Sequence, residues 1–385
     1  MKFNWPIGLA IGALIAGCVL AAGSANIDSM ITDRANLSNM DLSGMNLSKA
    51  HLNQSDMRGS SLNLSNLNGT YLRSAWLKDS ELKGAKLVDS DLNGADLTGA
   101  YMEGSDLTGA SLDRAKMSGI NLCRARLVKA DFTEADLSDA DLSDADLTDA
   151  RLFRADLSGA ILRGIYLTSA NLIGAHVSWA DMSGGYLSRG QFSRAELYDT
   201  NLSGSDLSDA DFTRAYLMRT DLTGANMNWA NMAYADLTEA TLVDTSLNSA
   251  KLPYADMTRA NLTGADLSDS DLNMALLVGS ILKNAKLNRV NLRELDLRGV
   301  DLSGASLRNS KFVSVFLTNA NMRNSDLRDA SLDRVEMTGV DLSGANLERI
   351  EYDQFTLLSL TKANLTGAKM SQGLQDDLKS VKGDA

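Results

Sequence analysis

The sequence contains few aromatic residues, prolines, histidines or cysteines. Aromatic residues make up 5% of the 385 residues, and there are 2 prolines, 2 histidines and 2 cysteines. A core built from this composition must rely on aliphatic side chains and alanine. Positive charge is also scarce, because 37 Lys and Arg stand against 49 Asp and Glu, for a net charge of −12. This balance argues against direct, sequence-general binding of nucleic acid, whose phosphates would need neutralising.

The amino terminus differs from the rest of the chain. Residues 1–25 combine Lys2, an apolar run over 7–22 and small residues behind it, which is the order of a secretory signal. The run is shorter than the about 20 residues of a membrane span. Three outcomes stay open: cleavage after Ala25, lipidation of Cys18 in a lipoprotein-like IAGC box, and an uncleaved anchor that attaches the chain to a membrane. Each of them predicts export.

A period of five residues runs through most of the chain. Counted in fives from Leu37 to Tyr352, all 64 positions are apolar or aromatic, 49 of them Leu. A small residue usually stands two places before each, and mostly Asp or Asn stands between, so the unit is A-(D/N)-L-x-x. In a helix, a step of five residues rotates the side-chain direction by about 140° net, and in a strand it moves the side chain to the opposite face. Neither continuous element buries such a stripe, so the chain must turn a corner once per unit.

Turn-forming residues fill the two places after each core position. Gly94 and Gly344 stand in the second place, which suits the positive φ of a type II turn. Other units have Asp or Arg there, and for these we expect a type I-like corner. Pro253 stands in the first place, where a turn favours proline. Within each short extended piece the small residue and the Leu face inward, and the Asp or Asn faces outward.

These units resemble the pentapeptide-repeat family over residues 35–352, about five-sixths of the chain. The resemblance implies an all-β fold, a right-handed quadrilateral parallel β-helix with four units per coil. The 64 units would then form about 16 coils, which at about 4.8 Å per coil span about 75 Å. Each coil covers the leucines of its neighbours, so stability is a sum of nearest-neighbour interfaces.

Both ends depart from the repeat. We expect residues 26–34 to cap the first coil. Residues 353–370 break phase and predict a phase-shifted last coil with core positions at Leu360, Leu365 and Met370. Residues 371–385 predict a short amphipathic helical cap, because helical spacing separates Leu374, Leu378 and Val381. The family resemblance implies a homodimer through this cap.

The inner small positions become bulky late in the repeat. We expect the larger residues to widen or flatten the late coils; they are Val290, Leu295, Val300, Val315, Val335, Val340 and Ile350.

A coil of 20 residues places residue n beside n + 20, so outward columns follow from the sequence. One column carries arginine and tyrosine over four successive coils, and three outward places elsewhere carry an apolar residue instead of Asp or Asn. Such side chains are typical of protein interfaces. The alternative is ordinary decoration of a solenoid surface. The candidate partner surface therefore comprises Arg194, Arg214, Tyr234, Tyr254, Leu276, Ile281 and Phe316.

Charge is uneven along the repeat, and catalytic motifs are missing. Residues 131–149 carry eight acids and no base, whereas residues 283–328 carry nine Lys and Arg against four acids. Calcium needs six to eight converging oxygens, whereas these acids would point to all four sides, so we predict no metal site. His51 and His176 lie about six coils apart, and Cys123 would be the only cysteine left after cleavage. We therefore predict no enzyme, no cofactor and no disulfide.

Two functions remain open. The first is an exported, non-catalytic rod that has a structural role or binds an unknown protein partner. It would lie in the bacterial periplasm or on a membrane facing it, or in the lumen of a photosynthetic bacterium. The second is implied by the family resemblance: a cytoplasmic DNA mimic that binds and protects a type II topoisomerase from quinolone drugs. The export signal, the basic late segment and the lack of projecting loops favour the first.

Overall fold

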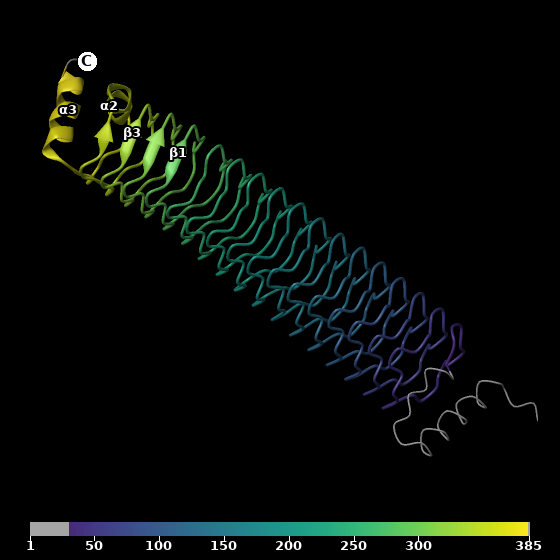
Figure 1. The fold of residues 1–385 in the computed structure, drawn as a ribbon. Helices are drawn as coiled ribbons and strands as arrows, with labels where there is room; N and C mark the ends of the chain where they lie inside the picture. Colours follow the sequence, from purple (N-terminus) through teal and green to yellow (C-terminus); the bar gives the residue numbers. More distant parts are fainter. Residues whose placement is uncertain (1–30, 384–385) are drawn as a thin grey trace, which may run out of the picture. The chain divides into compact units, whose positions relative to one another are not determined.

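A computed structural model describes residues 31–383; the expected signal at 1–25, Cys18 and most of the 26–34 cap lie outside the described residues. The chain divides into two compact units, of which unit 1 ends at Gln191 and unit 2 begins at Phe192. Within each unit the chain winds as a right-handed quadrilateral parallel β-helix of 20-residue coils (Figure 1). The fold class predicted from the repeat is confirmed.

Most pentads make the same backbone hydrogen bonds. Leu37 N–H donates to the Asp56 carbonyl at 2.7 Å, and Asp56 N–H donates to the Ala35 carbonyl at 2.9 Å. Met40 N–H closes the turn onto the Leu37 carbonyl at 3.3 Å. The first two bonds join adjacent coils and the third fixes the corner. Because every side repeats this scheme, the outward residue of one coil pairs with the residue 20 places later.

The corners share one backbone conformation. Every residue in the second place after a core position, from Arg34 to Arg349, has a positive φ, whether or not it is glycine. Asp139 has φ 56° and Arg154 has φ 55°, so the type I-like corner expected for Asp and Arg is wrong. The reason is the stacking of coils: Asp139 N–H donates to the Ser158 carbonyl at 2.9 Å, a bond that recurs from corner to corner. A single corner with another conformation would lose this hydrogen bond to the coil before it and to the coil after it.

The core lies inside the coils and consists of the five-residue stripe with its small partners. Leu47, Leu107 and Leu247 have no exposed surface, and neither do Ala110 and Ala250. Full burial of a Leu side chain stabilises the fold by about 1.5–3 kcal/mol before its conformational entropy is subtracted. Coil-on-coil stacking supplies this burial because it covers each leucine from both sides.

Longer strands appear only in unit 2 of the described chain. Four of them form a parallel sheet in the order β1-β2-β3-β5, and β4 pairs with β6. Their bounds are β1 Asn291–Arg293, β2 Lys311–Val313, β3 Ser331–Asp333, β4 Asn346–Leu347, β5 Glu351–Tyr352 and β6 Lys369–Met370.

Bulky inner residues account for this change at one corner. Leu295, Val315 and Val335 follow β1, β2 and β3, and all three are buried. Their backbone bends here without the hydrogen-bonded turn that closes most other corners of the described coils. Val300 and Val340 keep that turn, at 3.2 and 3.1 Å. The late coils therefore have an opened turn at one corner, and their widening stays a prediction.

Helix α2, Gln354–Leu360, begins the segment in which we expected a phase-shifted coil. Asp353 caps it by accepting the Thr356 N–H at 2.9 Å. Thr356 Oγ1 accepts the Val335 N–H at 3.0 Å, and Ser359 Oγ accepts the Met337 N–H at 2.5 Å. Helical hydroxyl groups thus satisfy strand N–H groups that another coil would otherwise satisfy, which the five-residue pattern does not reveal.

Helix α3, Gln372–Gly383, follows β6 and is the predicted helical cap. Leu374 and Leu378 are buried, and Val381 is half-buried. The Tyr352 hydroxyl donates to the Asp377 carboxylate at 2.6 Å and so ties α3 to β5. Over residues 31–383 no helix is long and apolar enough to cross a membrane.

Candidate functional site: a corner strip and an apolar patch

The outward aspartates act mainly within their own turns. Asp136 Oδ1 accepts the Ser138 N–H at 3.1 Å and the Ser138 hydroxyl at 2.6 Å. The same two bonds link Asp131 to Thr133, Asp141 to Ser143 and Asp146 to Thr148. The four outward aspartates of the acidic stretch 131–149 therefore have a structural role in their turns. Among residues 31–383 no group of three or more His, Cys, Asp or Glu is placed to hold a metal ion.

The basic stretch 283–328 is largely neutralised by nearby acids. Seven of its nine cations form ion pairs, three of them with acids outside the stretch. Asp326 lies between Arg308 and Arg328, at 2.5 and 2.8 Å. The hydrogen bond from Arg328, supported by Arg308, lowers the pKa of Asp326 to about 2. The stretch is therefore less basic than its composition suggests.

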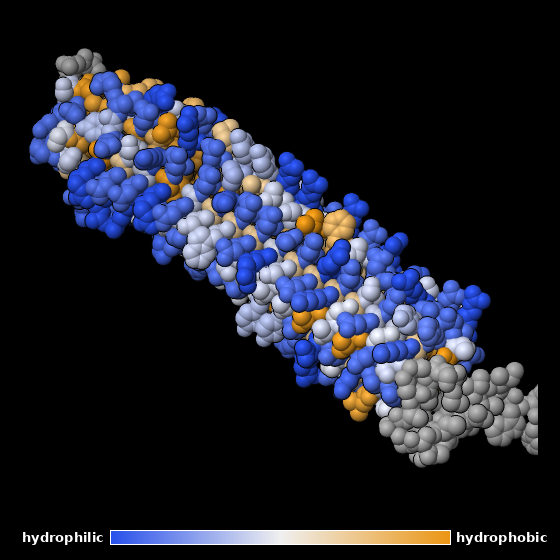
Figure 2. Space-filling view, in the orientation of Figure 1, coloured by the Kyte–Doolittle hydropathy of each residue, from blue (hydrophilic) through white to orange (hydrophobic). Residues whose placement is uncertain are grey.

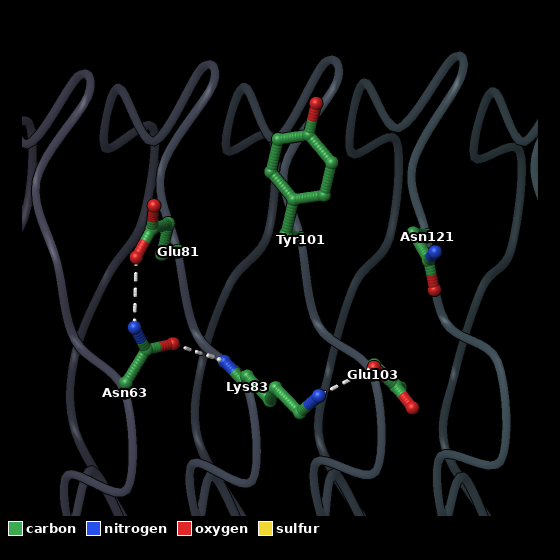
Figure 3. A pocket seen from close by; sticks show the side chains of 6 residues that line it. All are labelled: Asn63, Glu81, Lys83, Tyr101, Glu103 and Asn121. Atoms are coloured by element: carbon green, nitrogen blue, oxygen red, sulfur yellow. Dashed lines mark hydrogen bonds and ion pairs between the residues drawn. The ribbon is translucent and has the colours of Figure 1, made fainter.

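A shallow depression of about 260 Å³ lies on one side of unit 1 (Figure 3). Asn63 Nδ2 donates to Glu81 at 2.8 Å, and Lys83 Nζ donates to Glu103 at 2.8 Å. The hydrogen bond and charge of Lys83, with Arg124, lower the pKa of Glu103. Tyr101 is exposed above these groups. Asn63, Glu81, Lys83 and Glu103 are thus linked to one another by hydrogen bonds and an ion pair.

The predicted arginine and tyrosine column is present in unit 2. The Tyr234 and Tyr254 rings stack with centroids 4.8 Å apart and an interplanar angle of 0°. The Arg214 guanidinium lies 5.5 Å from the centre of the Tyr234 ring, within cation–π range. Met274 continues the column by one coil and was missed, although the n + 20 rule would have found it. We call Arg194, Arg214, Tyr234, Tyr254 and Met274 the corner strip.

The strip is exposed although its backbone is fixed. Tyr234, Tyr254 and Met274 are 52%, 46% and 41% exposed. All five members occupy second-place corners with positive φ. The 4.8 Å ring spacing equals the spacing of hydrogen-bonded strands, so each side chain stands directly over its neighbour.

The three predicted apolar positions are exposed but lie on two sides of the coil. Leu276 and Phe316 share one side, two coils apart, where they pair with Asp256 and Asp296. Ile281 lies on the next side, beyond the corner at Gly279. Val278, which was missed, is exposed beside Leu276. Leu276, Val278, Ile281 and Phe316 form the apolar patch.

Stacking contacts elsewhere show that columns alone do not define a site. Tyr166 and Tyr186 stack at 4.7 Å in unit 1, and Arg154 lies over Phe153. Arg114 pairs with Asp113 at 2.8 Å. Figure 2 shows small groups of hydrophobic side chains scattered over a mainly hydrophilic face. The corner strip differs from these columns because it joins two arginines, two tyrosines and a methionine in consecutive coils.

Comparison with known proteins places this β-helix in a family. The family model described as pentapeptide repeats matches as eight copies over stretches from 33–63 to 310–349. The chain is therefore a member of the pentapeptide-repeat family. No curated protein matches the chain. The comparisons indicate no catalytic family.

Three solved structures are among those similar to the chain. HetL from the cyanobacterium Nostoc sp. strain PCC 7120, involved in heterocyst differentiation regulation, is 30% identical over 69% of this chain and 94% of its own, with a TM-score of 0.25. Trypsin-treated QnrB1 M102R, a plasmid-mediated fluoroquinolone resistance protein, is 14% identical over 63% and 95%, with a TM-score of 0.28. A pentapeptide repeat protein from the Arabidopsis thaliana thylakoid lumen is 22% identical over 46% and 88%, with a TM-score of 0.13.

Proposed function

We propose that this chain is an exported, non-catalytic pentapeptide-repeat protein of the bacterial envelope whose unit 2 binds a protein partner. The observation that carries the proposal is the corner strip together with the apolar patch. Elsewhere most outward places hold Asp, Asn, Ser or Thr engaged in their own turns. Exposed Tyr and Arg are residue types that anchor protein interfaces, and an exposed apolar cluster is typical of a contact site.

The geometry supports binding rather than catalysis. The corner strip presents ring edges, guanidinium groups and a thioether in one line. The polar groups of the depression at Glu103 are paired with one another, and Lys83 and Arg124 hold that carboxyl in its charged form. A surface of this kind can hold a ligand in place but offers no general acid at neutral pH.

A site-specific photo-crosslinker tests the binding surface in the cells of origin. We expect benzoylphenylalanine at position 254 or 276 to give one discrete crosslinked product, identified by mass spectrometry. The same group at Ser246, on a side of unit 2 that carries neither the corner strip nor the apolar patch, is the matched control and should give none. The product at 254 should disappear when Arg214→Glu is added. Equal products from positions 246 and 254 would contradict the proposal.

Fractionation and the mass of the mature amino terminus test the export part. We expect loss of about 25 residues, a lipid on Cys18, or membrane retention of the intact chain, as the signal pattern of residues 1–25 predicts. Full-length protein in the cytosol would contradict export. It would favour the alternative, a DNA mimic that binds a type II topoisomerase. The basic stretch was one argument against that alternative, and its ion pairs weaken this argument.

A further inference from the structure

The donors of the corner strip lack acceptors within the described chain. No carboxylate of residues 31–383 lies within ion-pair distance of Arg194 or Arg214. Arg219 and Arg259, at a neighbouring corner, pair with Asp199 and Glu239 at 2.7 and 2.6 Å. The hydroxyl groups of Tyr234 and Tyr254 likewise make no hydrogen bond to a described residue. Four donors in four successive coils thus remain available to a ligand.

The charges along the strip predict where a ligand is acidic. Arg194 and Arg214 form no ion pair within the described residues, and their two guanidinium groups outnumber the one acid, Glu196, that stands two places after a strip arginine. They therefore attract an acidic segment at the Arg194 end. Asp236 and Asp256, two residues after each tyrosine, accept the N–H groups of Thr238 and Thr258 at 3.0 and 2.9 Å. Their charge disfavours acids along the tyrosines. The complementary ligand is therefore acidic at one end and uncharged along the rest.

The spacing of the strip selects the conformation of a bound polypeptide. Two coils advance by about 9.6 Å, twice the 4.8 Å between the Tyr234 and Tyr254 rings. A polyproline II helix advances by about 9.3 Å in three residues and leaves its carbonyl groups free to accept hydrogen bonds. A β-strand repeats every about 6.8 Å, and an α-helical turn rises about 5.4 Å, so both drift out of register within the strip.

We propose that the corner strip binds an acidic, proline-rich polypeptide segment in the polyproline II conformation. The segment runs along the coil axis with three residues per two coils. Its acidic residues face Arg194 and Arg214, its carbonyl groups accept from the tyrosine hydroxyls, and its prolines pack on the Tyr254 ring edge and Met274. This proposal rests on the protein-binding function proposed above and names the class of partner.

The tyrosines of the strip are already held in the conformation that binding requires. Pro253 fixes φ immediately before Tyr254, and Tyr254 N–H donates to the Asn273 carbonyl at 2.9 Å. The two tyrosine rings restrain each other through their parallel stack. Little entropy of the tyrosine side chains is therefore lost when a ligand binds.

Fluorescence anisotropy with a labelled nonapeptide tests the proposal on the full chain. The probe is Glu-Glu-Glu followed by two Pro-Pro-Ala triplets. We expect saturable binding that weakens with salt. A second probe replaces the three glutamates by lysines, and a third replaces each proline by serine. Both should bind about tenfold more weakly. Equal binding of all three probes would overturn the proposal.

Substitutions locate the probe on the protein. Arg214→Glu should weaken binding about tenfold, and Arg194→Glu with Arg214→Glu should reverse the preference toward the lysine probe. Tyr254→Ala should weaken the binding of the glutamate probe, including the part of the affinity that does not depend on salt. The matched control is Lys283→Glu, the same charge change on another side of unit 2, and it should leave affinity unchanged. Equal weakening by Lys283→Glu would overturn the assignment to the strip.

The two proposals fail separately. If position 254 crosslinks a partner in cells but the purified chain binds no glutamate probe, the partner class proposed here is wrong and the protein-binding function stands. If the probe binds as expected but no crosslinked partner forms, the strip recognises the predicted peptide chemistry and the cellular function is wrong.

Discussion

The side-chain oxygen of Asn93 accepts the backbone N–H of Asp113 at 2.9 Å, from one coil to the next. In most pentads the first-place N–H is capped by the outward Asp or Asn two residues earlier. Asp113 lacks this cap because Ser111 takes the outward place, and Asn93 supplies the acceptor. Seven first-place N–H groups are capped this way: those of Asn53, Arg73, Lys83, Val88, Asp113, Asn248 and Arg308. None of these pentads has an outward Asp or Asn.

This relation predicts a rescue between two positions 18 residues apart. Asn93→Ala should lower the free energy of unfolding by about 1 kcal/mol, because it leaves the Asp113 N–H without an acceptor. Adding Ser111→Asp should restore most of that loss by building the cap within the same pentad. Urea unfolding followed by circular dichroism measures both effects.

The matched control is Asn273→Ala, at an equivalent place. The Asn273 side chain makes no hydrogen bond within residues 31–383, so its removal should change stability by less than about 0.5 kcal/mol. If Ser111→Asp fails to improve the Asn93→Ala variant, the inter-coil cap does not contribute as argued.

The coil and its columns could be predicted from the sequence, whereas the exchange of caps could not. The stripe from Leu37 to Tyr352 excludes continuous helix and strand, and the 20-residue offset aligns Arg214 with Tyr234. Whether the Asp113 N–H is capped by Asn93 of the preceding coil or within its own pentad depends on which residue stands at 111. That dependence links two coils and is invisible in a single pentad.

Three further features depended on packing between coils. The positive φ at Asp139 and Arg154 follows from corner stacking and overrides their local turn preference. The opened corner at Val315 depends on the inner residues of successive coils. Helix α2 forms where the Thr356 and Ser359 hydroxyls can satisfy strand N–H groups, and no apolar period marks it.

A second prediction concerns the left-handed corner at Gly104. Its φ is 65°, and a Cβ added there would meet no heavy atom within 4 Å, so only backbone strain opposes substitution. Gly104→Ala should cost about 1–2 kcal/mol, and Gly104→Val more because its side chain is branched at Cβ. Gly104→Asn should cost least, because asparagine tolerates this region. Urea midpoints give the order.

Gly373 provides the control for this series. It lies in α3, has no neighbour within 4 Å of an added Cβ and lacks a left-handed φ. Gly373→Ala should be neutral or should stabilise the helix by up to about 1 kcal/mol. Equal costs for Gly104→Ala and Gly104→Val would show that backbone strain does not set the loss of stability at this corner.

A third prediction concerns the packing of Ile165 over Gly185, one coil apart in unit 1. An added Cβ at Gly185 would lie 3.3 Å from Ile165 Cγ2 and 3.0 Å from Leu187 Cδ1. Gly185→Ala should therefore cost about 1–3 kcal/mol by overpacking, and Ile165→Ala about 2–5 kcal/mol through a cavity. The double variant should be more stable than the sum of the two losses predicts, by at least about 0.5 kcal/mol.

A distant pair tests whether this coupling is local. Ile165→Ala combined with Gly104→Ala should be additive to within about 0.5 kcal/mol, because the two sites lie about three coils apart. Additivity of the Ile165 and Gly185 substitutions would contradict a shared packing space.

The last prediction concerns the attachment of α3 at high pH. Burial, with the hydrogen bond to Asp377, raises the pKa of Tyr352 from 10.0 to about 12. A group whose pKa is raised on folding stabilises the fold below its unfolded pKa and loses that contribution as the pH rises through its folded pKa. The attachment of α3 should therefore weaken between pH 10 and about 12, because the phenolate would face the Asp377 carboxylate. Hydrogen exchange of the α3 amides measures this loss.

Two variants isolate this titration from that of the lysines. Tyr352→Phe removes the ionising hydroxyl, so α3 should exchange faster at neutral pH but show no additional step above pH 10. Asp377→Asn keeps an acceptor and removes the negative charge, so the step should move to lower pH, because less opposes the phenolate. If Tyr352→Phe released α3 over the same range as the unmodified chain, another group would control the attachment. Leu374 and Leu378 remain buried in both variants and should keep the helix formed at neutral pH.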